Sequence, residues 1–134
     1  MKTKRLDWWM AAAVLAHLVV TLAHGRAHDG GHVALGAAGY AFVLTVIVAG
    51  PLAGLALSLI QRRAGAIVVA STMAGALVFG VVNHFVFISP DHVSQVADEW
   101  RPLFTATAWL LVVSEVAGLA TALRASARPL EELS

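Results

Sequence analysis

Residues 8–32 read WWMAAAVLAHLVVTLAHGRAHDGGH, an apolar stretch with histidines spaced along it. His17, His24 and His28 lie at positions i, i+7 and i+11. At about 100° per residue, these offsets place the three imidazoles within roughly 40° of one another around a helix. The apolar part is long enough to cross the ~30 Å hydrocarbon core of a bilayer. The pattern therefore predicts a transmembrane helix with a stripe of histidines on one face.

The composition of the whole chain is that of an integral membrane protein. Hydrophobic residues make up 59% of its 134 residues and charged residues 13%, whereas about a quarter of the residues in soluble proteins are charged. We therefore expect the lipid bilayer to surround it. A net charge of only +1 argues against a nucleic-acid partner. The absence of cysteine excludes disulfides, thiolate metal sites and cysteine-ligated clusters.

Four long apolar stretches divide the chain. They predict a single all-α domain over residues 1–134, an integral membrane bundle of four transmembrane helices at about 8–28, 33–60, 66–88 and 103–123, with a polar tail at 124–134. Pro51 predicts a kink in the second helix, because proline removes a backbone donor. A cleaved signal peptide is the alternative for the first stretch, but that stretch is long, contains His17 and has no convincing cleavage site.

The basic residues indicate an orientation. Seven of the nine Lys and Arg lie before the first stretch, between the second and third, or after the fourth. Only Arg26, near the end of the first stretch, and Arg101, just before the fourth, fall on the other side. The positive-inside rule then predicts that both termini are cytoplasmic (N-in, C-in) and that the histidine-rich connections face the periplasmic or extracytoplasmic side of a bacterial inner membrane.

Helical rise sorts the polar residues by depth. His17 and Glu115 each lie about 12–13 Å from the inner end of their stretch, near the middle of the bilayer. A carboxylate is costly there unless it is protonated or paired, so we expect Glu115 to pair with His17 for helix association or as a proton relay. His24, His28 and His84 fall together about 24–30 Å from the inner end, near the outer surface.

This outer layer predicts a metal site. His24 and His28 form an HxxxH pair, which places two imidazoles one helical turn apart, as in chelating pairs. We expect His84 to be the third ligand and Asp91 or His92 the fourth. Nitrogen and oxygen ligands without sulfur favour Zn²⁺ or Cu²⁺. The sequence places three further polar residues where they could support the ligands, namely Asn83 beside His84, and Asp29 and His32 at the outer mouth.

Haem b is an alternative cofactor for the same residues. A bis-histidine haem takes one ligand from each of two facing helices, here His24 or His28 with His84. Gly25 and Gly80, about one turn before His28 and His84, would leave room for the ring. A chlorophyll-type pigment needs a single imidazole and also remains open.

The function of such a site stays open at this stage. Electron transfer or metal handling are the leading hypotheses, and a zinc-dependent membrane hydrolase or a proton or ion relay through His17 and Glu115 are others. The polar residues could also serve only to join helices in a non-catalytic subunit of a larger respiratory or photosynthetic complex. Small residues at Gly50 and Gly54, and at Ser114 and Gly118, predict close helix contacts and association with a second copy or other membrane subunits.

Overall fold

The computed structural model describes residues 6–128, and every regular element in that range is helical. The elements in chain order are α1 (Trp8–Gly30), α2 (Ala37–Phe42), η1 (Val43–Ala49), α3 (Gly50–Ser58), α4 (Arg62–Val81), η2 (Val82–Val86), η3 (Val93–Gln95) and α5 (Arg101–Ala127). η1 and η2 are π-helical and η3 is a single 3₁₀ turn. Lys2, Lys4 and Arg5, and residues 129–134 of the predicted tail, lie outside the described residues.

The prediction of an all-helical chain with four long apolar helices is confirmed. Helices long and apolar enough to cross a membrane run over Trp8–Gly30, Ala37–Ser58, Arg62–Val86 and Arg101–Ala127. α2, η1 and α3 run on as the second of these, and α4 and η2 as the third. The bounds differ from the predicted ones by at most a few residues. Many large apolar side chains point outward, as a bundle surrounded by lipid requires, among them Leu15, Val19, Leu22, Leu44, Val78, Leu110 and Val113.

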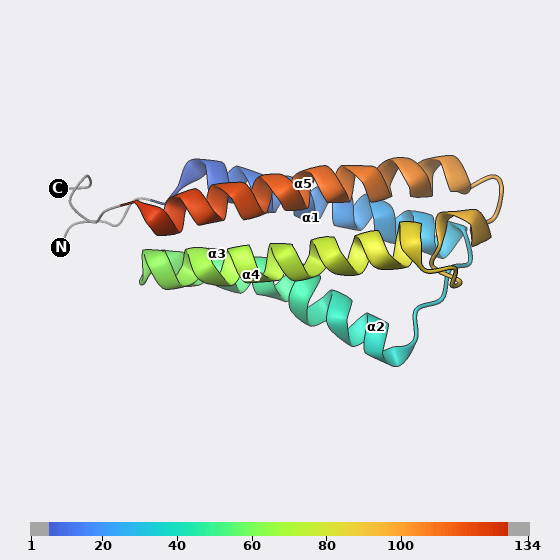
Figure 1. Cartoon of the computed structure of the whole chain (residues 1–134), viewed down its shortest axis with the longest axis horizontal. Helices are drawn as coiled ribbons and strands as arrows, with labels where there is room; N and C mark the ends of the chain where they lie inside the picture. Colours follow the sequence, from blue (N-terminus) through green and yellow to red (C-terminus); the bar gives the residue numbers. More distant parts are fainter. Residues whose placement is uncertain (1–5, 129–134) are drawn as a thin grey trace.

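The four long helices form an elongated antiparallel bundle (Figure 1). α1 begins and α5 ends at the same end of the bundle, where α3 also turns into α4. The opposite end carries the connections 31–36 and 87–100, and we call it the loop end. Neighbouring helices therefore alternate in direction, which is the arrangement that short connections favour.

Small residues set the closest contact in the bundle. Gly65 of α4 lies directly against the backbone of Gly54 and Ser58 in α3, where a Cβ atom would have no room. Gly50 likewise faces the Thr72 side chain of α4. The predicted Gly50/Gly54 face is thus used within the chain, so it no longer argues for a partner. Association with other subunits stays a prediction.

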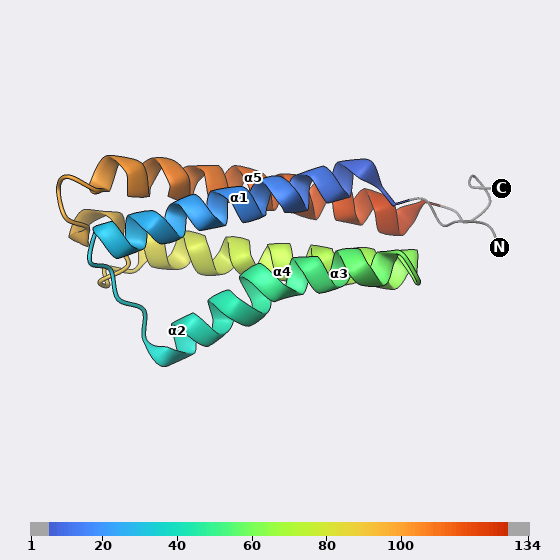
Figure 2. The same ribbon diagram turned by 180° about the vertical axis from the view of Figure 1, so that it is seen from behind.

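The second long helix leaves the bundle towards the loop end. Figure 2 shows α2 diverging from the other helices, whereas α3 stays against α4. The irregular stretch is η1, which ends just before Pro51 rather than at it. Because Pro51 has no N–H, the carbonyl of Ile47 loses its usual donor four residues later. The Nε2–H of His17 on α1 donates to this Ile47 carbonyl at 3.2 Å. A buried polar side chain of α1 thus satisfies the backbone group that the proline frees.

Candidate metal centre

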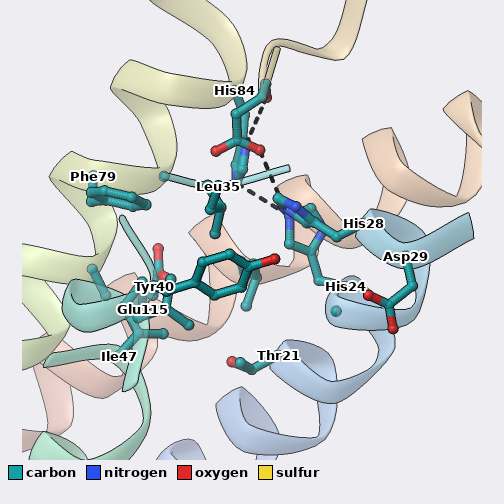
Figure 3. Close-up of a pocket in the computed structure, with 16 residues that line it drawn as sticks. Thr21, His24, His28, Asp29, Leu35, Tyr40, Ile47, Phe79, His84 and Glu115 are labelled. Carbon is teal, nitrogen blue, oxygen red and sulfur yellow. Dashed lines mark hydrogen bonds and ion pairs between the residues drawn. The ribbon is translucent and has the colours of Figure 1, made fainter. Parts of the chain in front are cut away.

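Three imidazoles meet at the loop end of the bundle (Figure 3). His24 and His28 come from successive turns of α1, and His84 comes from η2. Each offers one ring nitrogen, and these nitrogens all lie within 4.8 Å of one another. His24 and His84 are buried and His28 is partly buried. A group of three histidines at this spacing could hold a metal ion.

Asp91 determines which ring nitrogen of His84 carries a hydrogen and which carries the lone pair in the neutral ring. Nδ1 of His84 lies 3.1 Å from the carbonyl oxygen of Asp91 and 3.3 Å from its carboxylate Oδ1. A carbonyl and an ionised carboxylate can only accept hydrogen bonds, so Nδ1 carries the hydrogen. The lone pair of a neutral His84 is then on Nε2. Carboxylate or carbonyl partners orient metal-binding histidines in this way.

Thr107 of α5 has the same effect on His24. Its hydroxyl donates to the carbonyl of Leu103 at 2.7 Å, so its oxygen is left to accept. Nδ1 of His24 lies 2.8 Å from that oxygen and therefore carries its hydrogen. In neutral His24, as in His84, the lone pair is on Nε2.

The two free nitrogens face each other. Nε2 of His24 lies 3.2 Å from Nε2 of His84. Two lone pairs at this distance repel each other unless a positively charged species, a proton or a metal ion, lies between them. Metal–nitrogen bonds of about 2.0–2.1 Å at a tetrahedral angle would put two ligand nitrogens about 3.3 Å apart. The observed separation is close to that value.

Asp91 supplies a negative charge beside these rings. It is 5% exposed, and its Oδ1 lies 3.2 Å from Nε2 of His28 and 3.3 Å from Nδ1 of His84. Neither carboxylate oxygen has a hydrogen-bond partner among residues 6–128. A buried carboxyl group without hydrogen bonds is costly, and a cation or a hydrogen-bond donor beside it lowers that cost. Asp91 can therefore complete the site as a ligand through movement of its side chain, or as the group that holds His84.

Phe104 of α5 packs against all three imidazoles. Its ring centroid lies 4.6 Å from that of His24, 5.0 Å from that of His28 and 5.2 Å from that of His84. Phe104 is fully buried, in one apolar cluster with Ala27, Val33 and Val96. This cluster covers the loop-end side of the histidines and limits the access of water, which strengthens electrostatic interactions inside.

The remaining predicted site residues lie apart from the group. His92 bonds to Ser94 within its own connection, and His32 is exposed. Asp29 is exposed, and Figure 3 shows its carboxylate directed away from the three rings. Asn83 donates to the carbonyl of Phe79 on its own helix, so Asp91 takes the orienting position that we predicted for Asn83.

His17 and Glu115 lie at the same depth, as their positions in the sequence predict. Nδ1 of His17 is 4.0 Å from Oε1 of Glu115, which is longer than a hydrogen bond. The shorter contact of His17 is with Ile47, described above. Glu115 is 1% exposed, and its Oε2 has no hydrogen-bond partner among the described residues. The expected pairing is therefore a loose contact that leaves Glu115 partly unsatisfied.

Thr107 and Phe104 are the site residues that the sequence did not single out. Thr107 and Ser114 are spaced i, i+7 and therefore lie on one face of α5, the face that turns inward. That spacing could have indicated Thr107. Phe104 resembles any other apolar residue in the sequence, because only its contacts distinguish it.

A cavity of about 150 Å³ adjoins the three histidines. It lies between α1, η1, α4 and α5, and Glu115 lines it together with His24, His28 and His84. A metal ion held by the three imidazoles would therefore have an open side.

Comparison of the chain with protein-family models, with curated proteins and with solved structures finds no match. The chemistry of the site thus has to be argued from its own geometry.

Proposed function

We propose that this chain is an integral membrane protein that binds one transition-metal ion through His24, His28 and His84. The observation that carries the proposal is the 3.2 Å separation of the His24 and His84 Nε2 atoms, which both carry lone pairs when the rings are neutral, because each Nδ1 bonds to an acceptor. A proton could bridge two nitrogens. The third imidazole favours a metal ion, because a proton that bridges two nitrogens does not bind a third, whereas a metal ion can bind all three.

The donor set selects the class of metal. Three imidazoles with one carboxylate nearby, and no sulfur, suit Zn²⁺ or Cu²⁺. The three nitrogens lie within 4.8 Å of one another, and those of His24 and His84 are already 3.2 Å apart. The His28 nitrogen is therefore the one that must move closer to the other two to bind the same ion. His28 is the least buried of the three rings, and its contact with Asp91 is the one that would be exchanged for the metal.

The same geometry favours an ion over haem. Haem iron takes two axial imidazoles on opposite faces of the ring, so the porphyrin plane must pass between them. Rings whose Nε2 atoms are 3.2 Å apart leave no space for that plane. A cavity of about 150 Å³ matches one that holds a single benzene molecule, and a macrocycle is several times larger.

Three protein ligands and an open side are typical of metal sites that act on a further molecule, whereas structural zinc sites are closed by four protein ligands. Bound zinc would act as a Lewis acid, and bound copper would also allow electron transfer. The residues of the chain position the ion, orient its ligands and exclude water. The bias of basic residues supports the proposal that the loop end, and with it the metal ion, faces the periplasmic side of an inner membrane.

Metal content tests the proposal directly. The protein is purified in detergent, stripped with a chelator and titrated with Zn²⁺ and separately with Cu²⁺, and bound metal is counted by elemental analysis. We expect one ion per chain, and the variant His24→Ala to weaken its binding at least 100-fold. His92→Ala is the matched control, since His92 bonds within its own connection.

Two results would reject the proposal. The first is a wild-type protein that retains no stoichiometric Zn²⁺ or Cu²⁺, which would leave a shared proton between His24 and His84 and a role in helix association. The second is equal loss of metal in the His24→Ala and His92→Ala variants, which would place the ion elsewhere.

A further inference from the structure

The cavity beside the histidines has mostly apolar walls and two polar ends. Its apolar lining includes Leu35, Val43, Ile47, Ala76, Phe79 and Leu111. The three histidines form one polar end and Glu115 forms the other (Figure 3), and Asp91 also lines the cavity. Pockets of this kind, apolar with a few convergent polar groups, are typical of binding sites for small organic molecules.

The divergence of α2 creates this cavity and leaves it open on one side. α2 leaves the bundle at η1 (Figure 2), and Tyr40 at this side is 52% exposed. A Cβ atom built on Gly25 of α1 would meet no atom within 4 Å. Both residues lie within the long apolar helices, so the opening faces the region that lipid would occupy.

Glu115 is the group in this cavity that lacks a partner. Its side chain is almost fully buried, and its Oε2 accepts or donates no hydrogen bond within residues 6–128. The same oxygen lies 4.0 Å from where a Cβ on Gly80 would be, and the His84 ring lies 3.8 Å from that point. Glu115 and His84 thus face the same space across a glycine. A buried carboxyl group without a hydrogen bond is costly, and a ligand with a hydroxyl or carbonyl group would satisfy it.

The size of the cavity limits the ligand to about one ring. An engineered apolar cavity of the same volume, about 150 Å³, binds benzene. A ring with an oxygen at each end would reach Glu115 on one side and the histidines on the other. We propose that this cavity binds the head group of a membrane quinol or quinone, entering from the bilayer beside α2 with its apolar tail left in the lipid. Only the contact on the histidine side rests on the proposed metal centre.

Titration of the full-length protein in lipid nanodiscs tests this site. The protein is loaded with Zn²⁺, which is redox-inert, and a benzoquinol with a ten-carbon tail is titrated by calorimetry. Tailless 1,4-hydroquinone and toluene are the comparison probes. We expect one tailed quinol to bind per chain. The affinity for 1,4-hydroquinone should be at least tenfold lower, and the affinity for toluene lower still, because toluene cannot form hydrogen bonds.

Substitutions at Gly80 and Glu115 locate the binding. Gly80→Leu fills the space between His84 and Glu115 and should weaken quinol binding at least tenfold. Gly80→Ala makes only ordinary contacts at 3.8 and 4.0 Å, so it keeps the fold and should weaken binding less. Glu115→Leu removes the hydrogen bond and should cost about tenfold. Gly36→Leu is the matched control for Gly80→Leu, because Gly36 has open space around it and does not line the cavity.

The outcomes separate this proposal from the metal centre. No saturable quinol binding to zinc-loaded protein overturns the cavity site and leaves the metal centre standing. Saturable binding by protein that takes up no zinc overturns the metal centre alone. Equal affinity for tailed and tailless quinol overturns the membrane source of the ligand. Binding unchanged by both Gly80→Leu and Glu115→Leu overturns the location in this cavity.

Discussion

Asp7 and Asp91 are both buried aspartates, at opposite ends of the bundle, but their surroundings differ. Oδ1 of Asp7 accepts the Met10 amide at 3.1 Å at the start of α1, and Oδ2 lies 3.3 Å from Arg128 and 3.9 Å from Arg62. Both oxygens of Asp7 have partners, and these join α1 to α4 and α5. The carboxylate of Asp91 lies against the imidazoles of His28 and His84, and neither carboxylate oxygen meets the hydrogen-bond criteria with any partner among residues 6–128.

The presence or absence of hydrogen-bond partners distinguishes polar residues that stabilise the bundle from those that we propose to lie beside a ligand. A buried carboxylate that stabilises a fold is paired and hydrogen-bonded, as Asp7 is. Asp91 and Glu115 are buried to a similar degree but leave oxygens unsatisfied, and the imidazoles near them present two facing lone pairs. Asp91 lies at the loop end and Glu115 lies deeper in the bundle, and both line the cavity beside the place where we propose the metal ion.

Addition of metal should change the free energy of unfolding more than any substitution below, and it should do so only through residues at the loop end. Zn²⁺ at 100 times its dissociation constant should raise the free energy of unfolding in detergent by about 2.7 kcal/mol, because the folded state binds the ion and the unfolded state does not. Thermal unfolding with and without a chelator measures this. His24→Ala should lose the increment, and an increment that remains in that variant would contradict the site.

Asp7→Ala should destabilise the bundle without affecting the metal. The substitution removes an N-cap, worth about 1 kcal/mol, and leaves the buried Arg62 without its counter-ion, for a total of about 2 kcal/mol. Equilibrium unfolding measures the loss, and Zn²⁺ titration of the same variant should give the wild-type affinity. A loss of zinc affinity would show that the two ends are not independent.

Asp91→Asn, in contrast to Asp7→Ala, should lower zinc affinity with little effect on stability. The amide keeps the size of the side chain but removes the charge beside His28 and His84, so zinc affinity should fall about tenfold, at the lower limit for outer-shell groups of metal ligands. Stability without metal should change little, because the amide oxygen of asparagine can keep the contacts that Oδ1 of Asp91 makes with His28 and His84. Unchanged zinc affinity would remove Asp91 from the site.

Asn83→Ala should have the smallest effect. The Asn83 side chain bonds only to the Phe79 carbonyl of its own helix, although it precedes His84 in the sequence. We expect zinc affinity within about twofold of wild type, since no contact with a metal ligand is lost. A tenfold loss would restore the supporting role that the sequence suggested.

The sequence predicts the fold because lipid leaves few choices. Four apolar stretches near 20 residues long must each form a helix, since no other single segment satisfies its own backbone hydrogen bonds in hydrocarbon. Helical rise along those helices then places His24, His28 and His84 at one depth, and the structure brings these three together. Depth is a local property, and spacing along the chain is enough to obtain it.

Spacing along the chain does not predict which way a side chain points around its helix, nor the path of the connections between helices. His17 lies level with Glu115, but its short bond goes to Ile47, because Pro51 frees that carbonyl and η1 carries it towards α1. Asn83 and His84 are adjacent in the chain, but they point to different neighbours. A shift of one residue on a helix turns a side chain by about 100°, and only packing decides which neighbour it then meets.

The amino-acid sequence by itself determined the four long apolar helices and the level along them at which His24, His28 and His84 lie. The tertiary structure alone decided that the Nε2 atoms of His24 and His84 face each other while Thr107 and Asp91 bond to their Nδ1 atoms, and that a cavity lies beside them where α2 diverges. Hydrophobic patterning acts over one helix at a time, whereas a binding site depends on distances of a few ångströms between residues far apart in the chain.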